Sequence, residues 1–170
     1  MCIRDRGSEG AIVDWSGLYL KEITLAPEAL IGAGFLAFST AMTVGRFLGD
    51  GISSRIGSVN IVALGSVIAI VGYGAVLSGH TLLAIVGFAL NGLGFSVIVP
   101  ELFRIGGNVK GVESAQGVAF IAGTGYSGFL IGPVILGFLA EEASLRHSFY
   151  ALLGCVFFVL AITFFLRRKK

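Results

Sequence analysis

Charged residues are scarce in this sequence. Asp, Glu, Lys and Arg make up 13% of its 170 residues, whereas soluble domains carry about 25%. So few charges exclude a soluble globular domain and a disordered segment, because both depend on charge to remain in water. The formal net charge of +2 is too small to indicate a nucleic-acid partner, which requires a strongly basic surface.

Cysteine and histidine are also rare, with two of each. Cys2 lies near the start of the chain and Cys155 lies inside an apolar run, so neither a disulfide framework nor a metal site is expected. Cys155 is interpreted as a small buried apolar residue. His80 and His147 fall at the edges of apolar runs and receive no role. We therefore expect no cofactor and no metal.

Apolar residues are abundant instead. They make up 55% of the sequence, and the mean hydropathy is +0.92. Five uncharged runs of 17 to 27 residues are each long enough to cross a hydrocarbon core of about 30 Å as a helix. They do not alternate between apolar and polar residues, as the strands of a membrane barrel would. The predicted fold is all-α, a polytopic bundle of membrane helices with spans at about 29–48, 59–77, 81–103, 114–140 and 148–166.

A sixth and shorter apolar stretch precedes these five runs. It covers about residues 9–20, contains Asp14, and resembles the second part of a membrane span whose first part is missing. Residues 1–8, Met-Cys-Ile-Arg-Asp-Arg-Gly-Ser, have no apolar core and do not form a signal peptide. We interpret them as a non-native leader and expect the chain to be a fragment, with residues 9–170 as one helical domain.

Basic residues are distributed unevenly between the two sides of the predicted bundle. Counting from the span at 9–20, the segments after spans two, four and six hold eight Lys and Arg residues, against only Lys21 and Arg146 on the other side. Cytoplasmic segments carry the excess of Lys and Arg. The C-terminus is therefore expected in the cytoplasm, in a multi-pass protein of the cytoplasmic (inner) membrane. The eight residues are Arg46, Arg55, Arg104, Lys110, Arg167, Arg168, Lys169 and Lys170.

The sequence contains two glycine-rich motifs. The first follows span two. This segment is G-R-F-L-G-D-G-I-S-S-R-I-G, from Gly45 to Gly57, and it is predicted to be a loop. Its Asp50 can cap a helix N-terminus or pair with an arginine such as Arg46 or Arg55. The alternative is an ordinary basic loop that only orients the protein in the membrane.

The second motif lies in span five and is G-F-L-I-G-P-V-I-L-G, from Gly128 to Gly137. Gly128, Gly132 and Pro133 fall on one side of the helix, with Gly137 further along. Small residues four apart let a neighbouring helix approach closely, and proline bends the backbone. The motif predicts a close helix–helix contact in span five.

The order of the two motifs resembles that of the major facilitator superfamily. In each six-helix half of that family, a G-x-x-x-D-R/K-x-G-R/K-R/K loop follows the second span and a glycine-proline motif lies in the fifth. Here Gly51 replaces the first basic residue, and Ser53 and Ser54 lengthen the turn before Arg55. The resemblance implies that this loop steadies one end state of a transport cycle. Its candidate gating residues are Gly45, Arg46, Gly49, Asp50 and Arg55.

Two further stretches resemble a bacterial branch of this family of the YbjJ type. E-G-A-I-V-D-W-S-G-L-Y-L, at 9–20, looks like its seventh span, and N-G-L-G-F-S-V-I-V-P-E-L-F, from Asn91, looks like its tenth. The resemblance implies the C-terminal six-helix half of a twelve-helix secondary transporter, with the first helix truncated. The implied function is transport of a small solute by alternating access, not an enzymatic reaction. The implied partner is the missing N-terminal half of the same protein, beside the lipid bilayer that the apolar runs require.

Few polar residues are available to contact a solute. In such transporters the solute lies near the middle of the membrane, where ionisable residues are functional candidates. Glu9 and Asp14 on the first span are the candidates for proton coupling, because an apolar site disfavours the charged form of a carboxylate. Trp15 can stack on a sugar-like ring, or it can serve as an ordinary anchor at the membrane interface.

Two later spans supply further candidates. Asn91 can bond a solute or simply another helix, and Tyr126 can offer its hydroxyl to a cavity or pack against a neighbour. Glu101 and Arg104 lie one helical turn apart and are expected to pair at the cytoplasmic edge. A structural or gating pair is favoured there over a substrate site.

Two other classes of membrane protein are alternatives. One is a channel or scaffold without alternating access. The other is an intramembrane serine protease of the rhomboid type, because Gly125-Tyr126-Ser127-Gly128 matches the G-x-S-G pattern around its nucleophile. The downstream His147 lies beyond the end of that span, about 20 Å of helix away from Ser127. A catalytic dyad needs hydrogen-bond contact, so the protease is not expected.

Overall fold

The computed structural model describes residues 12, 15–109, 111–142 and 144–168. Within these residues every regular element is helical. A helix covers residues 15–22, and it is followed by η1 (Glu28–Leu30), α2 (Ala33–Ile56), α3 (Ser58–Leu77), α4 (Thr81–Gly107), α5 (Ser114–Glu142) and α6 (Leu145–Arg168). Five helices in this part of the chain are long and apolar enough to cross a membrane. The prediction of an all-α bundle of membrane helices is therefore confirmed.

Two helices extend beyond their predicted ends. α2 continues to Ile56, so the segment that begins at Gly45 is helical and the prediction of a loop there is wrong. Gly57 alone turns the chain into α3, with a φ of +83°, a left-handed conformation that favours glycine. α4 likewise continues through Pro100 to Gly107. Membrane helices tolerate glycine and proline where neighbouring groups satisfy the freed backbone atoms.

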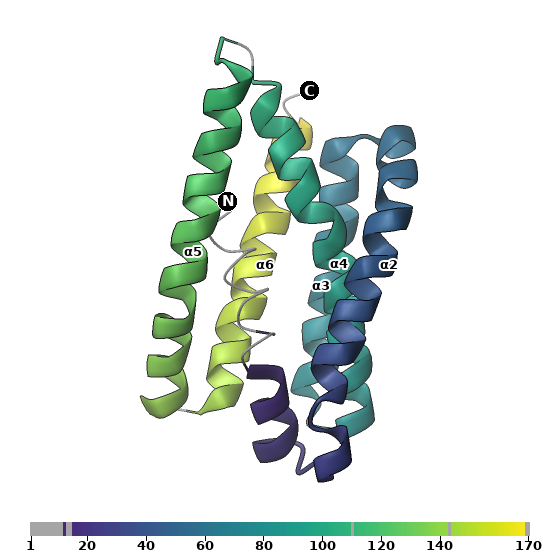
Figure 1. The fold of residues 1–170 in the computed structure, drawn as a ribbon, viewed down its shortest axis with the longest axis vertical. Coiled ribbons are helices and arrows are strands. Elements are labelled where there is room, and N and C mark those ends of the chain that lie inside the picture. Colours follow the sequence, from purple (N-terminus) through teal and green to yellow (C-terminus); the bar gives the residue numbers. More distant parts are fainter. Residues whose placement is uncertain (1–11, 13–14, 110, 143, 169–170) are drawn as a thin grey trace.

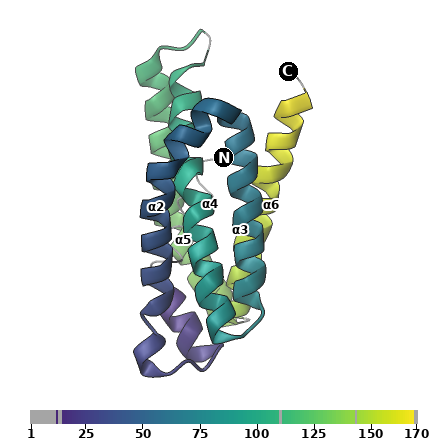
Figure 2. The same ribbon diagram turned by 90° about the vertical axis from the view of Figure 1, so that its right-hand side faces the viewer.

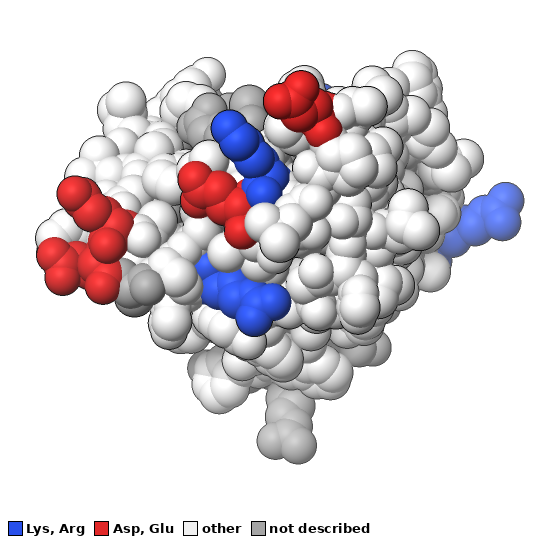
Figure 3. Space-filling view, turned by 90° about the horizontal axis from the view of Figure 1, so that it is seen from below, with Lys and Arg blue, Asp and Glu red and all other residues white. Residues whose placement is uncertain are grey.

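The helices α2 to α6 run up and down between the two ends of the molecule (Figure 1). We call one end the Gly57 end; it holds the α2–α3 turn, the connection at 108–113 and the end of α6. The Gly79 end holds the α3–α4 turn, the α5–α6 connection and residues 23–32. Seen from the Gly79 end, acidic and basic side chains are scattered over a mainly uncharged surface (Figure 3).

α4 lies between α2 and α3 and packs closely on both (Figure 2). Two pairs of facing glycines allow the approach of α3 to α4. A Cβ added at Gly65 would lie 2.6 Å from the carbonyl oxygen of Gly94, and one added at Gly72 would lie 2.8 Å from that of Gly87. Because lipid tails are as apolar as the side chains, such close backbone packing is what holds helices together in a bilayer.

An aromatic cluster fixes the helix at 15–22 against the other helices. The ring centroids of Tyr19 and Phe149 of α6 are 4.6 Å apart, and Phe149 lies 6.0 Å from Phe88 of α4. The Tyr19 hydroxyl donates to the carbonyl oxygen of Val76 of α3 at 3.0 Å. All three aromatic side chains are buried. Residues of the short first span are thus part of the same core as α3, α4 and α6.

Candidate functional site

The contact between α2 and α4 follows a stripe of small residues on α2. Gly45, Gly49 and Ser53 recur every four residues and therefore lie on one face of the helix. A Cβ added at Gly49 would lie 2.7 Å from Cγ1 of Val97, and one added at Gly45 would overlap Ser96. The two glycines let α2 approach α4 closely, and the stripe leads to Ser53 near the Gly57 end.

Ser53, Glu101 and Arg104 form a hydrogen-bonded cluster that joins α2 to α4. Ser53 Oγ donates to Glu101 Oε1. Arg104 Nη1 lies 3.3 Å from the same carboxylate oxygen and 3.2 Å from Ser53 Oγ. Ser53 is 2% exposed and Glu101 is 5% exposed, whereas the Arg104 side chain is 52% exposed. The predicted pairing of Glu101 with Arg104 is confirmed, and Ser53 joins the pair from a second helix.

The stability of this cluster depends on how the Glu101 carboxylate is compensated. A buried carboxylate is costly unless it is paired and hydrogen-bonded. Oε1 receives both donors, while Oε2 is buried without a hydrogen-bond partner among the described residues. Arg104 reaches the surface, so water can replace part of its bond. The arrangement therefore joins the last turns of α2 to α4 through one oxygen of a buried carboxylate.

The remaining gating candidates are distributed along α2 and not in a loop. Arg46 lies ten residues before Ile56, the last residue of α2, and its Nη2 is 3.4 Å from Sδ of Met42. Arg55 is exposed in the last turn. The backbone of Asp50 is helical, but its side chain lies outside what the structure describes. Pairing of Asp50 with an arginine stays a prediction.

The substrate candidates of the first span are only partly visible. Glu9 and Asp14 lie outside the described residues. Trp15 is partly buried, and its Cη2 would lie 3.6 Å from a Cβ added at Gly137 of α5. Its Nε1 is buried without a hydrogen-bond partner among the described residues. The indole therefore packs across the bundle against α5 and keeps an unused donor.

Asn91 and Tyr126 have opposite surroundings. Asn91 of α4 is fully buried, and its Oδ1 would lie 2.7 Å from a Cβ added at Gly72 of α3. It faces the contact between α3 and α4 and does not reach an open cavity in this conformation. Tyr126 of α5 is 59% exposed. Of these two candidates, Tyr126 is the one that a solute can contact directly.

The glycine-proline motif lies in an uninterrupted part of α5. Pro133 is inside the helix, Gly128 is buried and Gly132 is partly buried. Gly137 faces the ring of Trp15 at ordinary van der Waals distance. The tight helix contact predicted for this motif stays a prediction, because the described contact at its end is with a single side chain.

Ser53 is the residue of this cluster that the sequence analysis did not predict as part of a site. Its predicted place in a turn is wrong, because it lies inside α2 and bonds to α4. The available signal was spacing, since Ser53 continues the face of Gly45 and Gly49 by one more helical turn. The partner Glu101 could not be found that way, because it lies 48 residues away on another helix.

Ser127 and His147, the two residues considered for a serine protease, do not bond to each other but to other groups. Ser127 Oγ donates to the carbonyl oxygen of Gly123 at 2.9 Å, and His147 Nδ1 lies 2.9 Å from Ser144 Oγ. A serine nucleophile paired with that histidine has no support in these contacts. In the part of the chain that the structure describes, no group of three or more His, Cys, Asp or Glu residues could hold a metal ion.

Comparison with known proteins identifies relatives along nearly the whole chain. Residues 11–170 match the model of a family described as the Major Facilitator Superfamily. An uncharacterized MFS-type transporter of Yersinia pestis is 36% identical over 154 residues, which cover 90% of this chain and 39% of that protein. Membrane protein MosC of Rhizobium meliloti is 31% identical over 164 residues, covering 96% and 40% respectively. The chain thus spans about two fifths of the length of these relatives.

Solved transporter structures share the fold. A peptide transporter POT in complex with alafosfalin superposes with a TM-score of 0.84 at 18% identity, covering 98% of this chain and 36% of that one. The proton:xylose symporter XylE bound to 6-bromo-6-deoxy-D-glucose gives a TM-score of 0.78 at 16% identity, covering 96% and 42%. At such identities the likeness concerns the fold alone.

Proposed function

The chain belongs to the Major Facilitator Superfamily, and we propose that it forms the C-terminal six-helix half of a twelve-helix secondary transporter of the YbjJ-like branch. The observation that carries this proposal is coverage. The family match extends over residues 11–170, yet the chain spans only 39% and 40% of two relatives. The remaining length of those relatives leaves room for a second bundle of similar size.

The complete protein is proposed to move a small solute by alternating access. Support comes from the transporter names of relatives and from solved structures of similar fold that hold a small molecule. In such transporters the solute lies between two helical halves that rock around it. Tyr126 and Trp15 are the described residues that we assign to the solute-facing side, and Glu9 or Asp14 is assigned to proton coupling.

The α2–α4 contact is proposed as the gate of this half. The cluster of Ser53, Glu101 and Arg104 holds the end of α2 against α4, while Asp50 on the last turns of α2 is assigned to contacts with the other half. These contacts exist only while the Gly57 end is closed. A change of about 1.4 kcal/mol in their strength shifts a two-state population tenfold.

The Gly57 end is proposed to face the cytoplasm of the cell, at its inner membrane. Among the described residues, Lys21 and Arg146 are the Lys and Arg residues at the Gly79 end, whereas Arg55, Arg104 and the last two residues of α6, Arg167 and Arg168, lie at the Gly57 end. This distribution supports the positive-inside orientation predicted from the sequence. The exposed charges at the Gly79 end are Lys21, Glu22, Glu28, Glu141, Glu142 and Arg146.

Distances between spin labels on the full-length protein test the proposal without knowledge of the solute. One label pair joins Asn108, exposed at the Gly57 end, to the other half; a second pair joins Ser78, exposed at the Gly79 end, to the other half. We expect two populations at each end. Asp50→Asn should lengthen the first distance and shorten the second, because it weakens the closed Gly57 end.

The matched control is Glu113→Gln, which removes an exposed acidic residue at the same end. It should leave both distance distributions as they are in the unmodified protein. A single fixed distance at each end would exclude alternating access and favour a channel or scaffold. Two populations that respond equally to the two substitutions would exclude Asp50 from the gate.

A further inference from the structure

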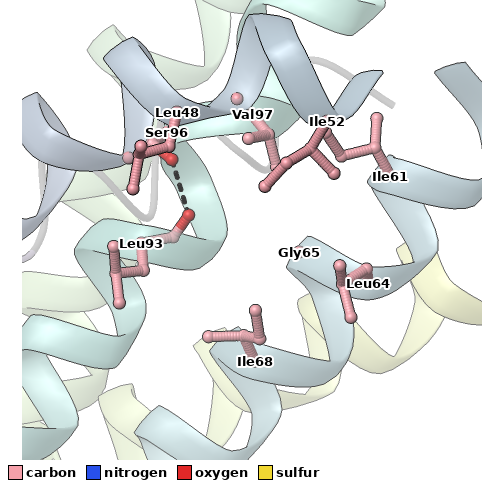
Figure 4. Close-up of a pocket in the computed structure, with 11 residues that line it drawn as sticks. Leu48, Ile52, Ile61, Leu64, Gly65, Ile68, Leu93, Ser96 and Val97 are labelled. Atoms are coloured by element: carbon pink, nitrogen blue, oxygen red, sulfur yellow. Dashed lines mark hydrogen bonds between the residues drawn. The ribbon is translucent and has the colours of Figure 1, made fainter. Parts of the chain in front are cut away.

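An apolar groove with a cavity volume of about 130 Å³ lies between α2 and α3, over α4 (Figure 4). Its walls include Leu48 and Ile52 of α2 and Leu64 of α3, and Val97 of α4 forms part of its floor. The polar side chain in the lining is Ser96, whose hydroxyl donates to a backbone carbonyl of its own helix at 2.6 Å. The groove therefore offers a bound molecule apolar contact and almost no hydrogen bonding.

The groove exists because α2 and α3 both pack on α4 but much less on each other. Gly49 brings α2 down to α4, and Gly65 does the same for α3. The side chains on the two rims point outward: Leu48 is 59% exposed and Leu64 is 47% exposed. The groove is thus open along the side of the bundle and is not enclosed in the core.

A groove of this kind must be filled when the bundle is in a bilayer. Ordered water is not expected there, because a water molecule needs two to four polar partners and Ser96 supplies the one polar side chain of the lining. An empty groove would forfeit the dispersion contacts of its walls. Lipid tails are as apolar as leucine, so a flexible acyl chain can enter from the side and restore those contacts.

The length of the groove and the charge at its end identify the class of lipid. From Gly45 to Arg55 the helix rises about 15 Å, which equals one leaflet of a hydrocarbon core of about 30 Å. Arg55 follows Ile52 by one turn, so it continues the groove side of α2, and it is exposed. Position 50, in contrast, lies about 140° around the helix from Gly45, which lines the groove, and is therefore on another side of α2. A chain in the groove would place its headgroup at the guanidinium of Arg55.

We propose that this groove binds one acyl chain of an anionic phospholipid, with the phosphate of the headgroup at Arg55. The proposal rests on the proposed function in one respect, the placement of the Gly57 end at the cytoplasmic leaflet, which is the anionic one. Guanidinium groups pair well with phosphate oxygens. The bound lipid would occupy the space beside the gate on α2, so its presence would resist movement of α2 toward α3.

Photolabelling of the full-length protein in nanodiscs tests the lipid site directly. Two lipids carry the same diazirine acyl chain, one with a phosphatidylglycerol and one with a phosphatidylcholine headgroup, and labelled residues are mapped by mass spectrometry. We expect groove residues of α2 and α3 to be labelled about fivefold more by the anionic lipid, as one basic residue near the membrane surface contributes. Arg55→Gln should abolish this preference while retaining the labelling by phosphatidylcholine.

Leu64→Trp tests the groove itself, because the larger side chain fills the space between its walls. Its matched control is Val67→Trp on the same helix, one turn away and similarly exposed at 45%, but absent from the groove lining. Labelling of α2 should fall to background in the first variant and remain in the second. Equal labelling in both variants would overturn the proposal, and so would crosslinks that place a helix of the other half in the groove. Labelling requires no transport, so a failure of the proposed transport cycle would leave this result unaffected.

Discussion

α4 and α5 are similar in length and apolar character but differ in what surrounds them. In the most apolar part of α4 half of the residues are buried, whereas in that of α5 only 11% are. The difference follows the position of glycine. Gly87, Gly92 and Gly94 of α4 face backbone oxygens of both α2 and α3. In α5, Gly117 faces α4, but a Cβ added at Gly123 would meet nothing within 4 Å. Hydropathy identifies both helices as spans, but only small residues at a contact identify which one forms the centre of the bundle.

The open side of α5 has a clear place in the proposed transporter. Phe120, Leu130 and Val134 are each more than 70% exposed although they are apolar. An exposed apolar face of this extent marks a surface that contacts protein or lipid. We expect the interactions of α4 to determine the stability of this half, and those of α5 to determine how it meets the other half and the solute.

The largest loss of stability is expected from a substitution at the centre of the bundle, where α4 packs on α3. Gly94→Leu places a side chain where a Cβ would already lie 2.6 Å from the carbonyl oxygen of Gly65, and a backbone atom cannot move aside easily. We expect a loss of about 3 kcal/mol or more, since overpacking costs about 1–3 kcal/mol even in milder cases. Thermal unfolding of the full-length protein in detergent measures it.

Gly123→Leu is the matched control for this substitution on α5. Position 123 has open space for a side chain, and the substitution removes a glycine from a helix interior. The stability of this variant should therefore be unchanged or raised by up to about 1 kcal/mol. If the two variants unfold at the same temperature, the contrast between α4 and α5 has no energetic basis.

A smaller effect is expected where α2 is tied to α4. Glu101→Ala removes the acceptor that both Ser53 and Arg104 use. Because Ser53 stays buried but Arg104 reaches water, we expect a loss of about 1 kcal/mol. Unfolding temperatures would report it, with Glu113→Ala, an exposed acidic residue of the same end, as the control. Equal stability of the two variants would remove the cluster from any structural role.

The smallest effect on stability is expected on the open face of α5. Tyr126→Phe removes one hydroxyl from a residue that is 59% exposed, so stability should stay within about 0.5 kcal/mol of the unmodified protein. Uptake of the solute by the full-length protein should nevertheless fall, because the hydroxyl is assigned to the solute-facing side. Unchanged uptake would mean that Tyr126 faces lipid, and would leave the contrast in stability intact.

The class of fold was predictable because uncharged runs long enough to span a bilayer leave few structural options. The position at which α2 ends was not predictable from the sequence. Arg46, Asp50 and Arg55 interrupt its hydropathy and therefore indicate a loop, although long basic side chains near a helix end can extend to the interface while the helix continues. A single glycine, Gly57, then suffices to turn the chain.

The candidate site was predictable only where its members are close in sequence. Glu101 and Arg104 are three residues apart on one helix, and their pairing follows from helical geometry. The contribution of Ser53 depends on how α2 packs against α4, which no local pattern specifies. The same limit applies to Asn91, whose burial against α3 follows from the facing glycines and not from its own polarity.

The ring contact between Tyr19 and Phe149 has a consequence for biosynthesis. Tyr19 belongs to the first described helix and Phe149 to α6, which is synthesised after the other described helices. Until α6 is inserted, the Tyr19 ring lacks one of its neighbours, so the early helices can enter the bilayer but cannot complete their core. Assembly of this bundle therefore finishes only after α6 has been inserted, and a truncated product lacking α6 would present an unfinished surface to quality-control proteases of the membrane.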